Sequence, residues 1–543
     1  MARLLIGPVL RHVGTSDATV WVETDAPCVV EVLGAREHTW EMAGHHYALV
    51  LVDGLEPGTA TPYTVSLDGE PVWPLPGDDR PAPRIRTQRE DGNVRLAFGS
   101  CRYGRASVKT DDPRFDPDAL AAYGRLLAAS PDDRWPDAML MLGDQVYADE
   151  TSEQTQRRIR AKRDIASGPG PEVADFEEYT WLYLESWTDP DVRWLMANVP
   201  SAMIFDDHDV RDDWNTSHEW RRDMQRMSWW QERIVGGLSS YWIYQHLGNL
   251  SPAELAQNEL YRQVRAAGAD GSDIAPLLRE FAAHADAEAD GAKGTRWSYR
   301  RDFGRVRLVM VDSRCGRILD GARSMLSEDE FAWLAEQMDG EMDHLLIGTS
   351  LPWLLARALH DVEAWDEVLA SGRRGRLLGR FGEWLRRAAD LEHWAAFDTS
   401  FRALGDLIAA VGRRADAPAS ICVLSGDVHH AYVAEAQFPE PTRSAVFQLT
   451  CSPLHNHVPP LMRLGFRVFW SRLAERSVRV LLGLVARVPV PPLSWRRVNG
   501  PFFSNELAEF VASGRAAYTV LTESAAEGDA RQLVEVARVT LAR

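Results

Sequence analysis

Three short segments of this chain share one design, in which an apolar run ends in carboxylates and a histidine. They are residues 137–147, 202–209 and 421–430. A short apolar run is typical of a strand that is buried on both faces of a sheet. Because carboxylates and imidazoles are costly to bury unpaired, each run has to end at a site that satisfies them. In open α/β sheets that site is the crevice at the carboxyl ends of the strands, so three such ends indicate a polynuclear metal centre.

Three further runs support a sheet of this kind. Residues 94–102 include Cys101, whose thiol is a potential metal ligand, and residues 306–314 end in an acid and a base, Asp312 and Arg314. Residues 344–350 end in hydroxyls only. The predicted strands alternate with helical segments from residue 94 onward, which favours an α/β fold or a two-sheet α/β sandwich.

The order of the motifs is similar to that of a known family. The motifs are Gly-Ser-Cys (99–101), Gly-Asp-x-x-Tyr (143–147), Asp-Asp-His-Asp (206–209), Asp-Ser-Arg (312–314) and Ser-Gly-Asp-Val-His (425–429). Together they resemble the PhoD-like (alkaline phosphatase D type) metallophosphatases of the calcineurin-like superfamily, over roughly residues 94–455. A lone Gly-Asp pair is more often a turn, whereas five motifs in this order, each behind a predicted strand, are specific. The resemblance implies a two-sheet α/β metallophosphatase sandwich and a metal-dependent phosphoric ester hydrolase.

The resemblance also implies a set of metal ligands. These are Cys101, Asp144, Tyr147, Asp207, Asp427 and His429. Asp144 is the candidate bridge between two cations, and Tyr147 matches the phenolate that binds ferric iron in the family. The other cysteines are expected to be small buried hydrophobes; they are Cys28, Cys315, Cys422 and Cys451.

Three further residues are candidates for catalysis. By resemblance His208 stands near the leaving group, where it acts as a general acid or stabilises the transition state. Arg102 and Arg314 have two readings that the sequence leaves open, a bidentate phosphate clamp or a salt bridge to the acidic site. Asp206 and Asp209 are expected to orient the ligands, and His430 to be a neighbour that binds no metal.

The chain departs from the family pattern at two places. Asp212 and Asp213 stand where the family usually has an asparagine pair, so no asparagine ligand is carried over. Thr349 and Ser350 stand where the wider superfamily often places a metal-ligating histidine. The second departure favours a PhoD-like site over a plain two-histidine site.

The expected reaction is hydrolysis of a phosphomonoester or phosphodiester by a metal-activated hydroxide. Oxygen ligands with one thiolate and one phenolate indicate a trivalent ion beside divalent ions. The resemblance implies iron (Fe³⁺) and calcium, with manganese or zinc as alternatives. Two other functions stay open: a non-catalytic metallophosphatase-fold scaffold, and a lipid-directed phosphodiesterase.

Two domains are predicted. Residues 1–88 are expected to form a fibronectin- or immunoglobulin-like β-sandwich. The proline-rich stretch 71–86, near the end of this range, is expected to act as the linker to the next domain. Residues 94–543 are expected to form the catalytic domain, with helical insertions and a solvated loop at 285–290. The chain is predicted to end in a β-hairpin made of residues 516–521 and 533–537.

Residues 459–489 form an apolar insert that carries arginines. Four arginines fall on one helical side, namely Arg472, Arg476, Arg479 and Arg487. The apolar residues fall largely on the other side; they are Leu473, Val480, Leu481, Leu484, Val485 and Val488. Such a helix usually packs its apolar face on its own domain; the alternative is peripheral contact with a membrane surface.

Composition restricts the choice of partners and compartment. The net charge of −19 argues against a general nucleic-acid-binding protein, which needs cations facing the phosphates. Five cysteines without a Cys-x-x-Cys pair favour a reducing compartment. Because the first residues contain neither a long apolar stretch nor twin arginines, we expect a cytoplasmic protein. The sequence does not define the oligomeric state.

Overall fold

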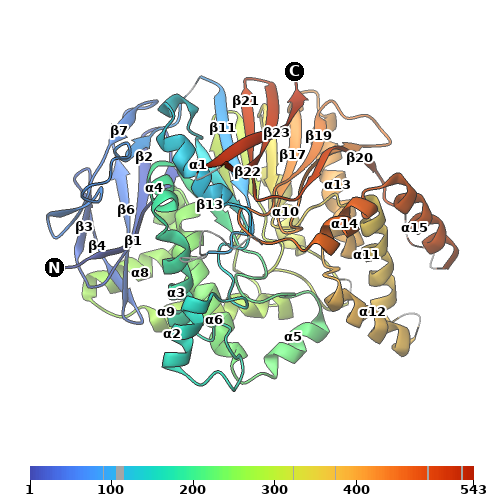
Figure 1. Ribbon diagram of the computed structural model, residues 1–543, viewed down its shortest axis with the longest axis horizontal. Helices are drawn as coiled ribbons and strands as arrows, with labels where there is room; N and C mark the ends of the chain where they lie inside the picture. Colours follow the sequence, from blue (N-terminus) through green and yellow to red (C-terminus); the bar gives the residue numbers. More distant parts are fainter. Residues whose placement is uncertain are drawn as a thin grey trace.

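The computed structural model describes residues 1–89, 91–104, 115–321, 323–372, 375–485, 488, 490–527 and 530–543. It is a mixed α/β structure in which an N-terminal β-rich unit precedes two large sheets covered by helices (Figure 1).

The N-terminal unit contains two four-stranded sheets and a two-stranded ribbon. One sheet has the order β1-β2-β6-β5 (Leu4–Val13, Asp17–Thr24, His45–Asp53 and Trp40–Met42). The other has the order β4-β3-β8-β9 (Ala35–His38, Val29–Val32, Val65–Leu67 and Glu70–Trp73). Alternate residues of both sheets, such as Val20 and Val50 of the first and Val30 and Val65 of the second, share one apolar core.

The proline-rich stretch 71–86 is not a free linker, contrary to expectation. Its start belongs to β9, and its end forms β10 (Arg84–Arg86), which pairs antiparallel with β7 (Ala60–Pro62). Ile85 is fully buried, and both flanking arginines lie over the ring of Trp135. This packing holds the segment against the N-terminal unit and the following chain.

The two large sheets share a core. The six-stranded sheet has the order β13-β12-β11-β21-β22-β23 (Ser201–Ile204, Ala138–Leu142, Asn93–Gly99, Glu506–Ser513, Ala516–Glu527 and Ala530–Ala542). The seven-stranded sheet has the order β14-β15-β16-β17-β19-β18-β20 (Tyr299–Phe303, Val306–Met310, His344–Gly348, Ser420–Ser425, Ala445–Thr450, Ala431–Gln437 and Ser494–Phe502). Leu140 of the first sheet and Leu346 of the second belong to the core between them. The predicted C-terminal hairpin is confirmed as β22 and β23.

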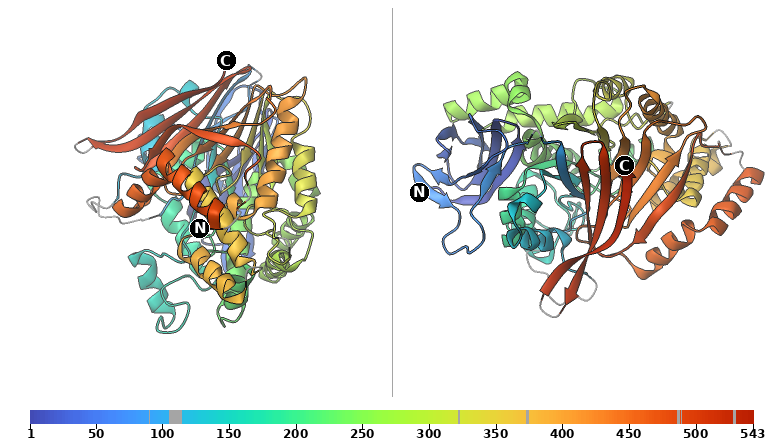
Figure 2. Two further views of the ribbon diagram at one scale, coloured as in Figure 1. Left: turned by 90° about the vertical axis from the view of Figure 1, so that its right-hand side faces the viewer. Right: turned by 90° about the horizontal axis from the view of Figure 1, so that it is seen from above.

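Helices cover the outer faces of both sheets (Figures 1 and 2). Met139 and Met141 alternate with Leu140 along β12 and pack into the helical layer, as the two-residue period of a strand requires. The helices are α1 (Ala119–Ala128), α2 (Glu153–Lys162), α3 (Phe176–Trp187), α4 (Pro190–Asn198), α5 (His218–Gln225), α6 (Trp230–Tyr241), α7 (Pro252–Gln257), α8 (Glu259–Asp270), α9 (Ala275–Asp286), α10 (Glu328–Gln337), α11 (Arg357–Ala370), α12 (Arg376–Ala388), α13 (Asp398–Arg413), α14 (Pro460–Phe469) and α15 (Arg472–Val485).

Residues 285–290 are not a solvated loop, contrary to expectation. They comprise the end of α9 and a 3₁₀ turn, Ala287–Asp290. The guanidinium of Arg221, which is almost fully buried, donates to the carboxylates of Asp286 and Asp290. A buried arginine needs acidic partners, and this need explains why Asp286 is buried against Arg221, whereas Asp290 pairs with Arg221 from the surface and stays 44% exposed.

The strand register brings the carboxyl ends of the central strands to one edge. In the six-stranded sheet Gly99 is opposite Met141, and Leu142 is opposite Ile204, all in parallel pairs. In the other sheet Gly348 is opposite Leu424. The loops that follow β11, β12, β13 and β17 therefore leave their sheets together, and they carry the residues singled out from the sequence.

Candidate metal centre

The loops after four strands meet around Asp144. The Cys101 thiol, after β11, donates to Asp144 Oδ2 at 3.2 Å. The backbone of the Cys101 loop also donates to that of the Asp144 loop, from Arg102 N to Asp144 O at 3.0 Å. Ser100 Oγ accepts from the backbone N–H of Asp427, after β17, at 3.1 Å. The structure therefore brings residues of both sheets to one site, as the sequence predicts.

Four of the predicted ligands lie in the left-handed backbone region. The φ angles are +55° for Cys101, +52° for Asp144, +65° for Asp427 and +49° for His429. Residues other than glycine rarely adopt this region, and when they do they cluster at functional sites. The strain persists here because each loop is fixed by the strand before it. The left-handed conformation turns the side chains of these separate loops toward the same point.

Asp209 orients the loops, as expected. Its Oδ2 accepts from the backbone N–H groups of Asp144 (3.0 Å) and Asp206 (2.9 Å). Its Oδ1 accepts from Gln245 Nε2 at 3.1 Å. One carboxylate therefore sets the geometry of two candidate ligand loops, the role that outer carboxylates play around metal sites.

The acidic side chains form two overlapping groups, each with ligand atoms within 4.8 Å of one another. One group contains Asp144, Asp207 and His208; the other contains Asp206, Asp207 and Asp427. Asp207 is common to both. Asp206, expected to act only as an orienting residue, contributes to the second group.

Three oxygens of this cluster, Asp144 Oδ1, Asp206 Oδ2 and Asp207 Oδ1, are buried and accept no hydrogen bond from the described residues. Burial and, for Asp144, the nearby Cys101 raise the pKa values of Asp144 and Asp206 well above their ordinary range. Crowded carboxylates of this kind need a cation, and their oxygens are suitable ligands for hard metal ions. The residues present therefore fit a metal centre.

Arg314 is fully buried behind these carboxylates. Its Nε donates to Asp206 Oδ1 at 2.5 Å, its Nη1 lies 2.5 Å from Glu392 Oε1, and its Nη2 lies 3.2 Å from Asp207 Oδ1. Of the two readings, the structure has the salt bridge and not a free phosphate clamp. Arg314 neutralises the cluster from behind and holds two of its members in place.

Arg102 is also engaged in an ion pair. Its Nε and Nη2 donate to Asp118 Oδ2 at 3.0 and 2.8 Å, and its Nη1 donates to the backbone oxygen and the hydroxyl of Ser186, both at 2.8 Å. With these bonds the guanidinium fixes the start of α1 to the end of α3. Arg102 therefore pairs with Asp118 and not with the carboxylates of the metal site, and its role as a phosphate clamp stays a prediction.

His208 and Tyr147 lie next to each other beside Asp144. The ring centroids are 4.7 Å apart, and the Tyr147 hydroxyl accepts from Asn456 Nδ2 at 2.9 Å. His208 Nδ1 pairs with Asp149 at 2.9 Å. Burial alone would lower the pKa of His208, but Asp149 and the other nearby carboxylates outweigh it and hold that pKa well above 6.5. The raised pKa favours the charged imidazolium, which is the form that can donate a proton.

Asp427 is held by a histidine that the sequence did not single out. His393 Nε2 lies 2.8 Å from Asp427 Oδ2, and His393 Nδ1 lies 2.7 Å from Glu363 Oε1. Burial would lower the pKa of His393, but the two carboxylates raise it well above its ordinary value. Burial would raise the pKa of Asp427, but the protonated His393 ring stabilises the ionised carboxylate and lowers that pKa to about 2.

The two consecutive histidines have different surroundings. His430 is fixed between the backbone oxygen of Val428 (2.7 Å from Nδ1) and the indole N–H of Trp470, which donates to Nε2 (3.2 Å), so it behaves as the expected neighbour. His429 belongs to neither of the two carboxylate groups. Its role as a ligand stays a prediction.

Five residues of the site were missed by sequence reasoning: Asp149, Glu363, Glu392, His393 and Asn456. Glu363 lies on α11, and Glu392 and His393 follow α12, so no apolar strand marks them. Asp149 follows Tyr147 by two residues, and an extension of that motif would have found it.

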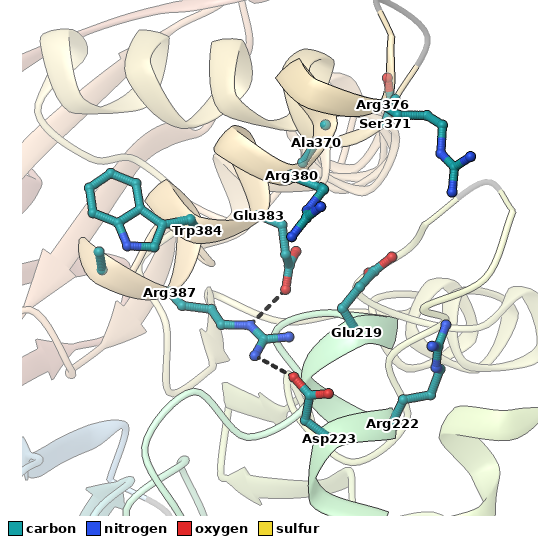
Figure 3. Close-up of a pocket in the computed structure, with 13 residues that line it drawn as sticks. Glu219, Arg222, Asp223, Ala370, Ser371, Arg376, Arg380, Glu383, Trp384 and Arg387 are labelled. Atoms are coloured by element: carbon teal, nitrogen blue, oxygen red, sulfur yellow. Dashed lines mark hydrogen bonds and ion pairs between the residues drawn. The ribbon is translucent and has the colours of Figure 1, made fainter.

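A separate cleft of about 980 Å³ opens between α5 and the α11–α12 region (Figure 3). Arg222, Arg376 and Arg380 line it, together with Glu219 and the ion-paired Arg387. None of the predicted site residues lines this cleft, so it is distinct from the metal centre.

The two-sheet α/β sandwich and the buried carboxylate cluster at its strand ends are the features expected of a metallophosphatase. Residues 114–463 match the family model described as PhoD-like phosphatase. The match spans more than half of the chain, which therefore belongs to the PhoD-like phosphatase family, and the resemblance seen in the sequence is confirmed. Residues 1–85 match a model described as a domain of unknown function (DUF7800).

Solved structures provide a fold comparison. One described as the structure of PhoD aligns with a TM-score of 0.58 at 11% identity, over 98% of this chain and 89% of that chain. A purple acid phosphatase, PPD1 from yellow lupin (Lupinus luteus) seeds, aligns with a TM-score of 0.47 at 10% identity, over 99% of this chain and 74% of that chain. The search of curated proteins found no match. The first alignment confirms the predicted fold class.

Proposed function

We propose that this metallophosphatase hydrolyses phosphomonoesters or phosphodiesters with metal ions held by Cys101, Asp144, Tyr147, Asp207, Asp427 and His429. The observation that carries the proposal is a set of buried oxygens that accept no hydrogen bond from the described residues: Asp144 Oδ1 and Asp207 Oδ1 of the proposed ligands, and Asp206 Oδ2 beside them. When bound, the metal ions supply Lewis acidity that acidifies water and neutralises phosphoryl oxygens. Arg314 holds Asp206 and Asp207 in position for this role, and His393 does so for Asp427.

A hydrolysis panel tests the proposal. Purified protein is assayed on alkyl and nitrophenyl phosphomonoesters and on bis(nitrophenyl) phosphate, before and after chelation and after metals are restored. We expect turnover that chelation abolishes and metal restores. Absence of turnover on all substrates in a protein loaded with metal would favour the non-catalytic scaffold.

For the metal identity we propose ferric iron with calcium, as the resemblance to PhoD-like phosphatases implies; the thiolate and phenolate beside the carboxylates favour a trivalent ion at one position. Tyr147→Phe should then bleach the colour that phenolate-to-iron charge transfer gives the protein, as measured by visible absorption. The conservative change Tyr103→Phe is the control, since that ring lies 5.4 Å from Tyr147 and is not a proposed ligand. A colourless and fully active enzyme without iron would reject the assignment and leave manganese or zinc.

The buried guanidinium of Arg314 gives a stability prediction. Arg314→Met leaves Asp206, Asp207 and Glu392 without their shared counter-charge, and breaking a buried ion pair typically costs about 3–5 kcal/mol. We expect the free energy of unfolding in denaturant, measured with chelator present, to fall by that amount. The surface pair Arg538–Glu535 supplies the control: Arg538→Met should change stability by less than about 1 kcal/mol. Equal effects of the two substitutions would contradict the role given to Arg314.

A further inference from the structure

The exposed apolar side chains of this protein are concentrated on one set of helices. Among the described residues, nineteen large apolar side chains are exposed, and eleven of them belong to α12, α14 and α15. Leu377 of α12, Leu461 of α14 and Leu473 of α15 are 83%, 80% and 77% exposed. So uneven a distribution marks an interaction surface. Figure 1 places the three helices on the same side of the molecule, around α11.

The exposed residues follow helical spacing, which makes them continuous stripes. Leu461, Leu464 and Val468 recur at i, i+3 and i+7 on α14, and Leu473 and Val480 at i and i+7 on α15. Leu377 and Trp384 repeat the seven-residue spacing on α12.

The helices also have inner faces, which are occupied. On α14 the ring of Phe466 lies 4.4 Å from that of His430, and Trp470 bonds to the same histidine. On α15 Leu482 packs in a small core with Ala364 of α11. The expectation that the insert packs its apolar face on its own domain is wrong for most of the residues it named: Leu473, Val480 and Leu481 are exposed, and Val488 is buried. On the arginine side, Arg479 packs against the domain through an ion pair with Asp361. The side chains of Leu484 and Val485, and Arg487, lie outside the described residues. The stripes of exposed residues are a second apolar face that none of the described residues covers.

The charge of this region is opposite to that of the whole chain. Residues 459–490 contain six arginines and one glutamate, in a protein of net charge −19. Arg472 and Arg476 of α15 are exposed and form no ion pair with described residues. Exposed leucine and tryptophan beside unpaired arginine is the pattern of helices that lie in the interface of an anionic bilayer.

We propose that an anionic lipid membrane docks on the face formed by α12, α14 and α15. A second copy of the chain fits less well, because a symmetric interface on this face would place arginines against arginines. The structure contains no helix, among the described residues, long and apolar enough to cross a bilayer, so the contact is with the membrane surface. The docking face reaches the metal centre through α14, whose inner side contacts His430, the neighbour of His429.

Vesicle sedimentation tests the proposal with the full chain. The probes are phosphatidylcholine vesicles with and without phosphatidylglycerol, at low and high salt. We expect binding to the anionic vesicles only, weakened by salt. Two variants should each bind the anionic vesicles about tenfold more weakly or worse. The three-leucine variant removes apolar contact through Leu461→Ser, Leu464→Ser and Leu473→Ser. The two-arginine variant removes positive charge through Arg472→Gln and Arg476→Gln.

Matched controls separate this face from the rest of the surface. Leu33→Ser, Leu75→Ser and Leu126→Ser remove three other exposed leucines, and Arg3→Gln with Arg36→Gln remove two other exposed arginines; both sets should bind like the wild type. Hydrolysis of a soluble phosphoester should be unchanged in every variant. Equal binding of the wild type and the three-leucine variant would overturn the proposal. A second result would also overturn it. If the wild type self-associates in sedimentation velocity and the three-leucine variant does not, the face is a dimer interface.

Discussion

Asp144→Asn should remove at least one metal ion per chain and lower phosphoester turnover by at least about 100-fold, because changes to groups that only orient metal ligands already cost 10–100-fold. Asp144 lies in a strained backbone conformation, its Oδ1 accepts no hydrogen bond from the described part of the chain, and its Oδ2 accepts one from the Cys101 thiol. An amide keeps the shape of the side chain but cannot supply the negative charge. Metal content by elemental analysis and initial rates measure the two effects.

The control is Asp416→Asn, since Asp416 is exposed and remote from the cluster. It should keep full metal content and turnover. Asp207→Asn is the informative comparison, because Asp207 is shared by both carboxylate groups. The position whose loss removes more metal is the bridge. Unchanged metal content and activity in Asp144→Asn would reject its assignment as a ligand.

His208→Ala should retain metal and lose rate by ~10²–10⁴, the range typical of general acid–base groups. Asp149 occupies Nδ1 of His208, which leaves Nε2 for donating a proton to the leaving oxygen. An alkoxide needs that proton as it departs, whereas a nitrophenolate does not. The loss should therefore be larger for alkyl phosphoesters than for nitrophenyl esters. Equal losses would leave His208 as an electrostatic group, and loss of metal would make it a ligand.

The pH profile of Asp149→Asn supports the same assignment. A general acid works in its protonated form, so the rate falls as the pH rises through the pKa of His208. Asp149 raises that pKa, so its replacement should move the fall in kcat on alkyl esters to lower pH, with the metal content unchanged. A pH profile identical to that of the wild type would show that Asp149 does not raise the pKa of the general acid.

Strand-end residues were predictable because two physical rules act on them together. An apolar run such as 138–142 predicts a buried strand, and the polar residue after it has to lie at the sheet edge, where parallel strands bring their ends together. Asp144, Asp207 and Asp427 were found in this way, and the structure brings their loops together.

Residues on helices and their flanking loops were not predictable by these rules. His393 and Glu392 follow a helix, and the contact between His393 and Asp427 spans 34 residues of sequence. The two readings of Arg314 could not be separated either, since its three carboxylate partners come from two distant segments. Likewise, the acidic stretch at 285–290 looked solvated because its partner, Arg221, is 65 residues away.

Diffraction from crystals of the purified protein, with anomalous data collected at the absorption edges of iron, manganese and zinc, tests the metal centre most directly. We predict anomalous density between the carboxylates of Asp144, Asp207 and Asp427, at ligand distances from their oxygens, with an iron signal next to Tyr147. An active crystal in which these oxygens surround only water would contradict a metal-dependent reaction at this site.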